Sequence, residues 1–334
     1  MNIEEYQGKK ILITGATGLI GKALIKELLK WNKFVDKKIR VIALVRDVKK
    51  ASMVFEEFLC KELEFLCADV CDLKPQNLNI SYIIHGASKT ASKTFINEPV
   101  ETIMTALNGT KNLLEFAKVN PVVGFVYLSS MEIYGTPTTD AKVDEQHSAS
   151  LNTMTIRSCY PESKRMCENL CASYASEYGV PAKVVRLTQT FGPGVQYNDN
   201  RVFAEFARCA IESRDIILNT KGETKRNYLY TEDAVSAILT VLTCGITGEA
   251  YNAANEETYC SIYEMACLVA EKCAEGRIRV DIIEDNDVTK FGYAPTLHMN
   301  LDTSKLRGLG WKPIIGLADM FKNMIYDMKY NITM

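Results

Sequence analysis

Short apolar runs alternate with helical patterns along the first 190 residues of this chain. Apolar runs that read as buried strands fall at residues 9–14, 39–45, 63–68, 82–85, 124–128 and 182–187. Helical spacing of apolar residues follows several of them, at residues 19–29, 100–119 and 160–178. Continuously apolar strands joined by helical crossovers are typical of a parallel sheet buried on both faces. We therefore expect an α/β fold built on a doubly wound parallel sheet.

The turn after the first predicted strand is rich in glycine. It reads Gly15-Ala16-Thr17-Gly18-Leu19-Ile20-Gly21 and leads directly into the first helical pattern. Gly15 allows a tight turn, Gly18 lets a diphosphate approach the backbone, and Gly21 lets the helix pack closely on the strand. The free N–H groups and the positive end of the helix dipole then hold the phosphates. This pattern predicts a Rossmann domain that binds a dinucleotide.

The end of the second predicted strand bears on the choice of dinucleotide. An acidic residue there binds the ribose hydroxyls of NAD, whereas this chain has Arg46, which is suited to the 2′-phosphate of NADP. A solvated Arg46, loosely stacked on the adenine, is an equally good interpretation. The sequence therefore leaves NAD and NADP open.

The regular alternation ends near Phe191-Gly192-Pro193-Gly194, and the elements beyond it are shorter and of mixed type. No flexible linker or low-complexity run separates the two parts. We expect a dinucleotide-binding domain at residues 1–190 and a smaller, mixed substrate-binding region at residues 191–334. The second region is expected to fold over the carboxyl edge of the sheet and to form one wall of a cleft.

The composition narrows the partners of the protein. With 39 basic and 41 acidic side chains the formal charge is -2, so no overall field attracts nucleic acid or an anionic membrane. The first residues do not resemble a secretory signal, and no apolar run approaches the roughly 20 residues of a membrane span. The 11 cysteines are scattered, without a histidine cluster that would complete a zinc site. We expect a cytoplasmic protein whose cysteines pack in the core, with no metal, no nucleic acid and no membrane partner.

Tyr160 and Lys164 lie four residues apart at the start of a predicted helix, where Pro161 is tolerated in the first turn. Their side chains can share one face. A nearby ammonium and an oxidised nicotinamide ring would favour the phenolate and make Tyr160 a base near neutral pH. Ser130 follows the strand at 124–128, at the carboxyl end of the sheet, and is placed to donate to the same substrate oxygen. Together with the glycine turn, this set predicts hydroxyl oxidation.

With these motifs, the chain resembles the extended short-chain dehydrogenases/reductases that act on nucleotide-linked sugars. The resemblance covers almost the whole chain. It also rests on the segments Asp69-Val70, His85-Gly86-Ala87-Ser88, Asn108-Gly109-Thr110, Ser129–Gly135, Arg186–Pro193, Arg226–Asp233 and Leu309–Pro313.

The resemblance implies roles for individual residues. Asp69 and Val70 would contact the adenine, unless Asp69 only caps a helix, and Lys164 would also hold the nicotinamide ribose. Arg226 would bind the diphosphate or ribose of the sugar nucleotide; the alternative is that Arg226 forms a surface ion pair. The implied cofactor-binding residues are Gly15, Thr17, Gly18, Leu19, Ile20, Gly21, Arg46, Asp69, Val70, Ala87, Ser88 and Lys164. The implied substrate-binding residues are Ser130, Gln189, Arg201, Val202 and Arg226.

Oxidation of the sugar at C4 opens three outcomes in this family: 4,6-dehydration, decarboxylation at C5 or epimerisation. Glu132 stands where the resembling dehydratases and glucuronate decarboxylases have a glutamate, which implies a base near C5. A purely structural carboxylate is the alternative. Met131 replaces the acidic aspartate of many hexose dehydratases. Residues 157–165 and 199–202 resemble decarboxylases of nucleotide-linked glucuronate, whereas Gln189 and Gly194 depart from them.

We therefore expect a nucleotide-sugar enzyme with a tightly bound NAD or NADP, catalytic residues Ser130, Glu132, Tyr160 and Lys164, and dehydration or decarboxylation assisted by Glu132. A 4-epimerase and an NADPH-dependent keto-sugar reductase are the alternatives. A non-catalytic nucleotide sensor is disfavoured because the serine, tyrosine and lysine are all present. The resemblance implies a homodimer through the helices at 100–119 and 160–178. Residues 195–205 and 285–300 are expected to select the nucleobase and the sugar, and His147 and His298 receive no role.

Overall fold

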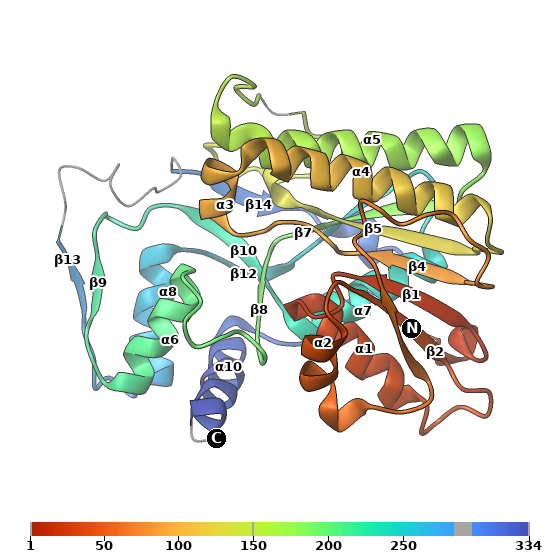
Figure 1. The fold of residues 1–334 in the computed structure, drawn as a ribbon. Coiled ribbons are helices and arrows are strands. Elements are labelled where there is room, and N and C mark those ends of the chain that lie inside the picture. The colour runs from red at the N-terminus through yellow and green to blue at the C-terminus, as the bar shows by residue number, and fades with distance from the viewer. Residues whose placement is uncertain (1, 149, 284–295, 333–334) are drawn as a thin grey trace.

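A computed structural model describes residues 2–148, 150–283 and 296–332 of the chain. Its centre is a parallel sheet of seven strands in the order β3-β2-β1-β4-β5-β7-β11 (Figure 1). This is the doubly wound α/β fold that the sequence predicts. The strands are β1 (Lys10–Thr14), β2 (Arg40–Val45), β3 (Leu63–Cys67), β4 (Tyr82–His85), β5 (Gly124–Ser130), β7 (Ala182–Leu187) and β11 (Ala250–Ala253).

Helices cover both faces of this sheet. In Figure 1, α4 (Pro99–Lys118) and α5 (Cys159–Tyr178) lie side by side on one face, with the short α3 (Ser92–Asn97) before them. The other face carries α1 (Leu19–Trp31), α2 (Val48–Val54) and α7 (Thr231–Cys244). In β1, Ile11 and Ile13 pack toward α1 and α7, and Leu12 packs toward α4 and α5. Burial on both faces explains why the strands read as continuous apolar runs.

Local signals set the ends of these helices. Pro99 is tolerated at the start of α4 because the first helical residue needs no intrahelical N–H partner. Gly179 ends α5 with a left-handed φ of 68°, which glycine adopts without a Cβ penalty. The observed bounds of α1, α4 and α5 differ from the predicted ones by one or two residues.

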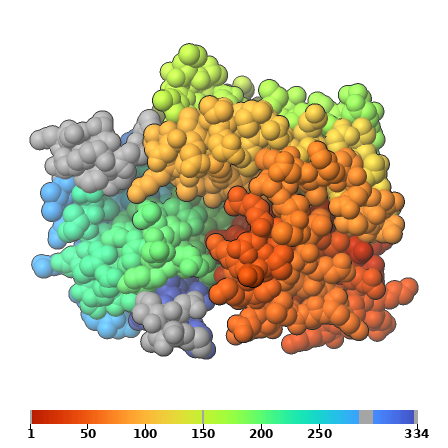
Figure 2. Space-filling view, in the orientation of Figure 1, coloured from red at the N-terminus to blue at the C-terminus, as the bar shows by residue number. Residues whose placement is uncertain are grey.

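The smaller region contains a second sheet in the order β12-β10-β14-β6, with β8 pairing against β10, and a separate pair, β9 and β13. Its helices α6, α8 and α10 pack around a core of their own. In Figure 2 the green to cyan residues of this region lie directly against the red to orange residues of the sheet region. The strands are β6 (Lys142–Val143), β8 (Gln189–Phe191), β9 (Ile216–Leu218), β10 (Lys225–Tyr230), β12 (Asn255–Ser261), β13 (Val280–Ile282) and β14 (His298–Leu301). The helices are α6 (Val202–Glu212), α8 (Ile262–Leu268), α9 (Ser304–Arg307) and α10 (Leu317–Ile332), with short turns η1 (Ile3–Tyr6), η2 (Glu56–Phe58), η3 (Met131–Tyr134), η4 (Ile156–Ser158) and η5 (Val269–Cys273).

The seventh strand of the central sheet lies outside the six predicted runs. It is β11, which pairs with β7 after the chain has passed through the smaller region. Asn252 interrupts its apolar pattern, because its buried amide donates to the carbonyls of Val143 (3.0 Å) and Asp302 (3.1 Å). Both α7 and β11 come after residue 191, so the later part of the chain contributes to both regions. The division at residue 191 stays a prediction.

The end of β5 also differs from expectation. Ser129 and Ser130 are its last two residues rather than residues after it, and they pair with Arg186 and Leu187 of β7. The strand is therefore longer than its apolar run. Ser130 still lies at the carboxyl edge of the sheet, where the sequence analysis expects it.

The structure also describes the burial of the cysteines and the character of the helices. All 11 cysteines are free thiols. Cys167 and Cys171 are buried between the sheet and α5, as expected of packing residues, but Cys67 is exposed at the end of β3. Within the described ranges, no helix is both long and apolar enough to cross a membrane, and no group of three potential ligands is placed to hold a metal ion.

Candidate active site

The glycine turn between β1 and α1 has the geometry of a diphosphate cradle. Gly15 has a φ of +68°, and a Cβ on it would lie 2.7 Å from the carbonyl carbon and oxygen of Gly86. A Cβ on Gly21 would overlap the Gly15 carbonyl oxygen. Gly18 precedes α1 without a side-chain cap, and both Thr17 and Gly18 are exposed. The first N–H groups of α1 are thus open to an anion, so these residues fit the diphosphate of a dinucleotide.

The loop after β4 is held next to this turn by a buried chain of hydrogen bonds. Thr14 Oγ1 contacts His85 Nδ1 at 2.8 Å and accepts from the Ala87 N–H at 3.1 Å. The other ring nitrogen, Nε2 of His85, lies 3.2 Å from Thr110 Oγ1. Burial, and secondarily the Lys164 ammonium, lowers the pKa of His85 to about 3, so the ring is neutral. This chain fixes the backbone at the predicted cofactor residues Ala87 and Ser88.

The predicted adenosine contacts lie at the ends of β2 and β3. Arg46 is exposed directly after β2, and Asp47 beside it caps α2 by accepting from the Lys50 N–H at 3.0 Å. Asp69 accepts from the Cys71 N–H at 2.8 Å within a turn, and no helix follows it before β4 in the described chain, so the helix-cap alternative for Asp69 is wrong. Val70 is buried against Gly109 of α4. The adenine role of Asp69 and Val70 and the choice between NAD and NADP stay predictions.

The structure brings Ser130, Tyr160 and Lys164 together at the carboxyl edge of the sheet. The Ser130 side chain lies close enough to the Tyr160 phenol for hydrogen bonding to favour the phenolate and so to lower the pKa of Tyr160. The Lys164 ammonium donates to the Leu128 carbonyl at 2.8 Å and lies 5.7 Å from the centre of the Tyr160 ring. It also lies 4.7 Å from the centre of the Tyr127 ring, which supplies a cation–π contact. The spacing that predicts one shared helix face for Tyr160 and Lys164 thus leads to one shared site.

Burial shifts both titrating groups of this set. It raises the pKa of the Tyr160 phenol, an effect that the Glu132 charge strengthens and that the Ser130 hydrogen bond and the Arg157 charge oppose. Burial lowers the pKa of Lys164 to about 8, although Cys167 and Glu168 act in the other direction. In the protein alone, Tyr160 is therefore a protonated phenol, and it needs added positive charge nearby to act as a base.

Phe95 covers the Tyr160 ring and was missed by the sequence analysis. The two rings stack with centroids 4.3 Å apart and planes inclined by 15°. Phe95 is buried, whereas the next residue of α3, Ile96, is exposed. A single aromatic residue in a short helical segment was the only signal in the sequence. The stack restricts the Tyr160 ring to one plane, which orients its hydroxyl.

Glu132 is engaged by Arg157, a residue the sequence analysis quoted only as part of a family motif. The guanidinium donates through Nη1 to Oε2 at 2.8 Å and through Nη2 to Oε1 at 3.1 Å. Burial would lower the pKa of Arg157, but the Glu132 carboxylate raises it above its ordinary value. The Glu132 N–H also donates to Ser130 Oγ at 3.2 Å. Arg157 thus orients the Glu132 carboxylate, while Ser130 holds the Glu132 backbone.

A second buried network supports the strand that carries Ser130. Ser129 donates to Glu168 at 2.5 Å, and Arg186 holds the same carboxylate from β7, with its shortest contact at 2.7 Å. Arg186 also donates to Tyr134 at 2.7 Å, and Tyr134 donates to the Asn252 side chain at 2.7 Å. Because charged partners in a buried network constrain geometry, this chain ties β5, α5, β7 and β11 together beneath the site.

The predicted substrate residues divide into two groups. Oε1 of Gln189 and Nε of Arg226 are buried and have no hydrogen-bond partner in the described part of the chain, as expected of groups that bind a ligand. Arg201 instead pairs with Asp199 at 2.6 Å, directly before Val202 begins α6. The predicted selectivity segment 195–205 contains this pair, whereas most of the segment 285–300 lies outside the described residues. Substrate roles for all four residues stay predictions.

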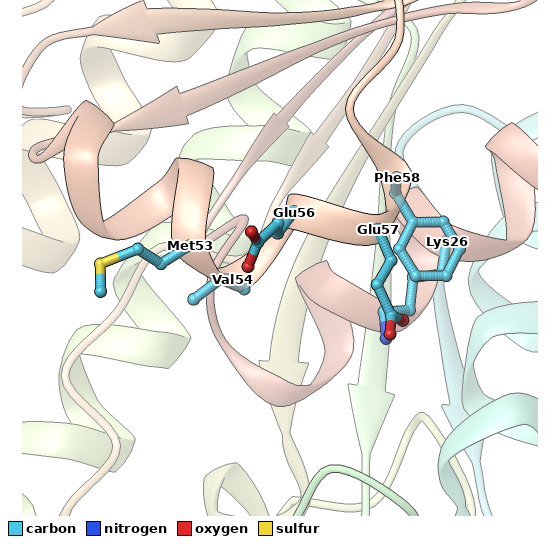
Figure 3. A pocket seen from close by; sticks show the side chains of 6 residues that line it. All are labelled: Lys26, Met53, Val54, Glu56, Glu57 and Phe58. Atoms are coloured by element: carbon cyan, nitrogen blue, oxygen red, sulfur yellow. The ribbon is translucent and has the colours of Figure 1, made fainter.

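The remaining histidines have partners of their own. His147 is exposed and meets the Tyr134 ring edge-on, and His298, on the strand that pairs with β10, contacts Asp140 at 3.0 Å. A surface pocket of about 190 Å³ lies between α1 and the segment that spans α2 and η2. Its lining residues are Lys26, Met53, Val54, Glu56, Glu57 and Phe58 (Figure 3). None of them belongs to the predicted site.

Comparison with known proteins agrees with this geometry. Residues 11–254 match the model of the NAD dependent epimerase/dehydratase family. UDP-glucuronic acid decarboxylase 1 of Xenopus tropicalis is 26% identical over 325 residues, which cover 97% of this chain and 73% of that protein. UDP-glucuronic acid decarboxylase 1 of Arabidopsis thaliana is 27% identical over 326 residues, which cover 97% of this chain and 70% of that protein.

Solved structures share the fold. UDP-glucose 4-epimerase from Thermotoga maritima superposes with a TM-score of 0.79 at 20% identity and covers 97% of this chain and 99% of its own. UDP-glucuronic acid 4-epimerase from Bacillus cereus, solved with NAD, has a TM-score of 0.76 at 20% identity and covers 96% and 99%. The family match confirms the predicted enzyme class and its nicotinamide cofactor. The chain is an enzyme of the extended short-chain dehydrogenase/reductase type and belongs to the NAD-dependent epimerase/dehydratase family.

Proposed function

We propose that the protein oxidises a nucleotide-linked sugar at C4 and then removes the C5 carboxylate of a glucuronate as carbon dioxide. The observation that carries this proposal is the convergence of Ser130, Tyr160 and Lys164 with the oriented carboxylate of Glu132 at one edge of the sheet. Full-length similarity to UDP-glucuronic acid decarboxylases supports the choice of substrate.

The environment of Met131 favours decarboxylation over 4,6-dehydration. Dehydration needs an acid that protonates the departing oxygen, and the thioether of Met131 cannot supply a proton. Met131 is moreover buried, with its sulfur accepting from Thr188 Oγ1 at 3.3 Å. Loss of carbon dioxide from a β-keto acid needs no such acid.

The proposed first step is a proton transfer within the Ser130, Tyr160 and Lys164 set. Ser130 donates to the C4 oxygen of the sugar, and Tyr160 accepts the C4 hydroxyl proton. When bound, the oxidised nicotinamide supplies positive charge and accepts a hydride from C4. The buried Lys164 ammonium adds a second positive charge beside Tyr160, which favours the phenolate.

The second step uses the new ketone at C4. The C5–carboxylate bond breaks, carbon dioxide leaves, and its electron pair passes to the C4 carbonyl as an enolate. A proton from water then adds at C5, and Tyr160 gives its proton back to the C4 oxygen; a bound reduced nicotinamide would supply the hydride for C4. In this proposal the Glu132 carboxylate, oriented by Arg157, positions the water that protonates C5.

The test is incubation of the purified protein with UDP-glucuronate, UDP-glucose, dTDP-glucose and UDP-N-acetylglucosamine, followed by mass analysis of the products. We expect loss of carbon dioxide from UDP-glucuronate alone. Loss of water would indicate a dehydratase, an unchanged mass with altered chromatography an epimerase, and net consumption of NADPH a reductase. Tyr160→Phe should lower turnover at least about a hundredfold while it still binds the cofactor. Normal turnover of this variant would contradict the proposed chemistry.

We also propose a homodimer that pairs α4 and α5 with the same helices of a second copy. These neighbouring helices expose the apolar side chains of Val100 (70%), Met104 (44%) and Met166 (52%) on the outer face of the molecule. Light scattering should give twice the chain mass for the wild type and the single mass for Met104→Glu combined with Met166→Glu. Phe34→Glu, at an exposed position (77%) before β2, is the control that should stay dimeric.

A further inference from the structure

Three buried polar atoms on two neighbouring strands have no hydrogen-bond partner among the residues that the structure describes. They are Oε1 of Gln189 on β8, and Nε of Arg226 and the hydroxyl oxygen of Tyr228 on β10. An unpaired buried polar group destabilises a fold, so native proteins rarely hold several together without a reason. Such a cluster is expected where a polar ligand completes the hydrogen bonds. Tyr228 received no role in the sequence analysis.

Strand pairing places the Gln189 and Tyr228 side chains on one face. β8 and β10 run parallel with Gln189 opposite Tyr228, and residues paired in this way project to the same side of a sheet. Arg226 precedes Tyr228 by two residues on β10, and the pairing of β10 with β12 is irregular between these two positions. Burial raises the pKa of the Tyr228 phenol, and the nearby Arg226 charge opposes this rise. The phenol and the guanidinium are thus electrostatic neighbours.

Aromatic packing fixes this face against the start of α6. The Phe191 ring meets the Tyr228 ring edge-on with centroids 5.8 Å apart, and it stacks on Phe203 with centroids 4.5 Å apart. Phe203 lies in the first turn of α6. The Tyr228 ring is therefore packed through Phe191 against the start of α6, on the strand that also carries Arg226.

The charge of this neighbourhood selects an anion. Arg226 forms no ion pair with any carboxylate in the part of the chain that the structure describes, and its Nε has no hydrogen-bond acceptor there. A half-buried guanidinium without an acid is stabilised by an anionic ligand, and its planar fork suits phosphate oxygens. A phenol hydroxyl beside it can donate to another oxygen of the same anion.

We propose that the Tyr228 hydroxyl binds the diphosphate of the nucleotide sugar beside Arg226 and the Gln189 amide. This inference rests on the proposed function, since it identifies the anion as that of a nucleotide-linked substrate. Tyr228 is a binding residue in this assignment and takes no part in proton transfer. Its contact is to the diphosphate, so it discriminates a nucleoside diphosphate from a nucleoside and not one base from another.

The test measures how loss of the Tyr228 hydroxyl changes ligand affinity and thermal stability. Tyr228→Phe should raise the dissociation constants of UDP and dTDP about tenfold, as loss of one hydrogen bond to a charged group predicts, and leave the weak binding of uridine unchanged. The same variant without ligand should unfold at an unchanged or higher temperature, because it loses an unsatisfied buried group. Titration calorimetry and thermal unfolding measure these two effects on the same samples.

Tyr6→Phe is the matched control. Tyr6, which precedes β8 by more than 180 residues, is fully buried as well. Its hydroxyl, however, has a partner, because it donates to the Leu239 carbonyl at 2.7 Å. This variant should unfold at a lower temperature and bind UDP like the wild type.

Three results would overturn the inference. Wild-type affinity of Tyr228→Phe for UDP and dTDP would do so, and so would an equal loss of affinity for uridine. A lower unfolding temperature with unchanged affinity would assign Tyr228 a structural role. If the wild type binds neither UDP nor dTDP, both the proposed function and this inference fail. If the wild type and Tyr228→Phe bind these ligands equally well, only this inference fails.

Discussion

Arg157 holds the Glu132 carboxylate with two parallel hydrogen bonds, although 25 residues separate them in the chain. Arg157 lies in η4, just before α5, and Glu132 lies in η3, just after β5. The pair therefore joins the two segments that carry Tyr160 and Ser130. Because a two-pronged contact fixes direction as well as distance, it decides where the Glu132 carboxylate points.

Glu132→Gln should separate the two halves of the proposed reaction. In a single turnover the first hydride transfer and the loss of carbon dioxide should persist, the former seen as absorbance of reduced nicotinamide, whereas protonation at C5 and formation of the final sugar nucleotide should fall about a hundredfold. The amide keeps the size of the side chain but loses the charge that Arg157 binds. An unchanged rate of final product formation would show that Glu132 is only structural.

Arg157→Lys should lower the rate of the step that Glu132 assists, protonation at C5, about tenfold, because one ammonium cannot replace two parallel donors. Folding stability should change by less than about 1 kcal/mol, since both partners of the pair are one-third exposed. Arg214→Lys is the matched control: Arg214 pairs with Glu205 and Glu212 on the surface, and its variant should retain full activity. Equal rates for both variants would contradict the positioning role of Arg157.

Lys164→Met should stabilise the protein while it removes activity. The pKa of Lys164 falls from its ordinary value of 10.5 to about 8 because the ammonium is buried, so the charged form destabilises the fold at pH 7 by about 3 kcal/mol. Loss of the hydrogen bond to Leu128 offsets part of the gain, which leaves about 1–2 kcal/mol.

The pH dependence of this effect provides its check. The lysine loses its proton in the folded protein above about pH 8 but keeps it in the unfolded chain up to about pH 10.5. Wild-type stability should therefore rise relative to Lys164→Met between these two values, so that the difference between them shrinks. Denaturant unfolding at pH 7 and pH 10 measures it, and a constant difference would contradict a buried charge at Lys164.

Gly15→Ala should be far more damaging than Gly179→Ala. Both glycines have a φ of +68°, so both substitutions carry the cost of a left-handed backbone, about 1–2 kcal/mol. A Cβ at Gly179 meets no atom within 4 Å, whereas one at Gly15 lies 2.7 Å from the Gly86 carbonyl. We expect Gly15→Ala to lose several kcal/mol and its dinucleotide affinity. Equal unfolding temperatures for the two variants would disagree with the close approach of the two loops.

His85 should make the protein sensitive to mild acid. Its pKa is about 3 in the folded state, while the unfolded chain takes up the proton near 6.5. Stability should therefore fall by about 1.4 kcal/mol for each pH unit below 6.5. His85→Gln should remove this component, and His147→Gln, at an exposed site, should not. Unfolding in denaturant at pH 7, 6 and 5 compares the slopes, and parallel slopes for all three proteins would refute the assignment.

Much of this molecule follows from local sequence. The apolar runs predict six of the seven strands of the central sheet, because a strand buried on both faces must be apolar throughout. The glycine turn predicts its own geometry, since only glycine fits the backbone at Gly15 and the close contact at Gly21. The spacing of Tyr160 and Lys164 predicts a shared helix face. Each of these properties depends on residues a few positions apart.

Contacts between distant segments were decided only by tertiary structure. The seventh strand, β11, carries a polar Asn252 whose partners lie 109 and 50 residues away. Phe95 reaches Tyr160, Arg157 reaches Glu132, and Tyr228 joins Gln189 only after the strands and helices have packed. Helix and strand periods determine which side of an element a residue occupies, but the neighbour it meets there depends on strand register and on how the layers pack.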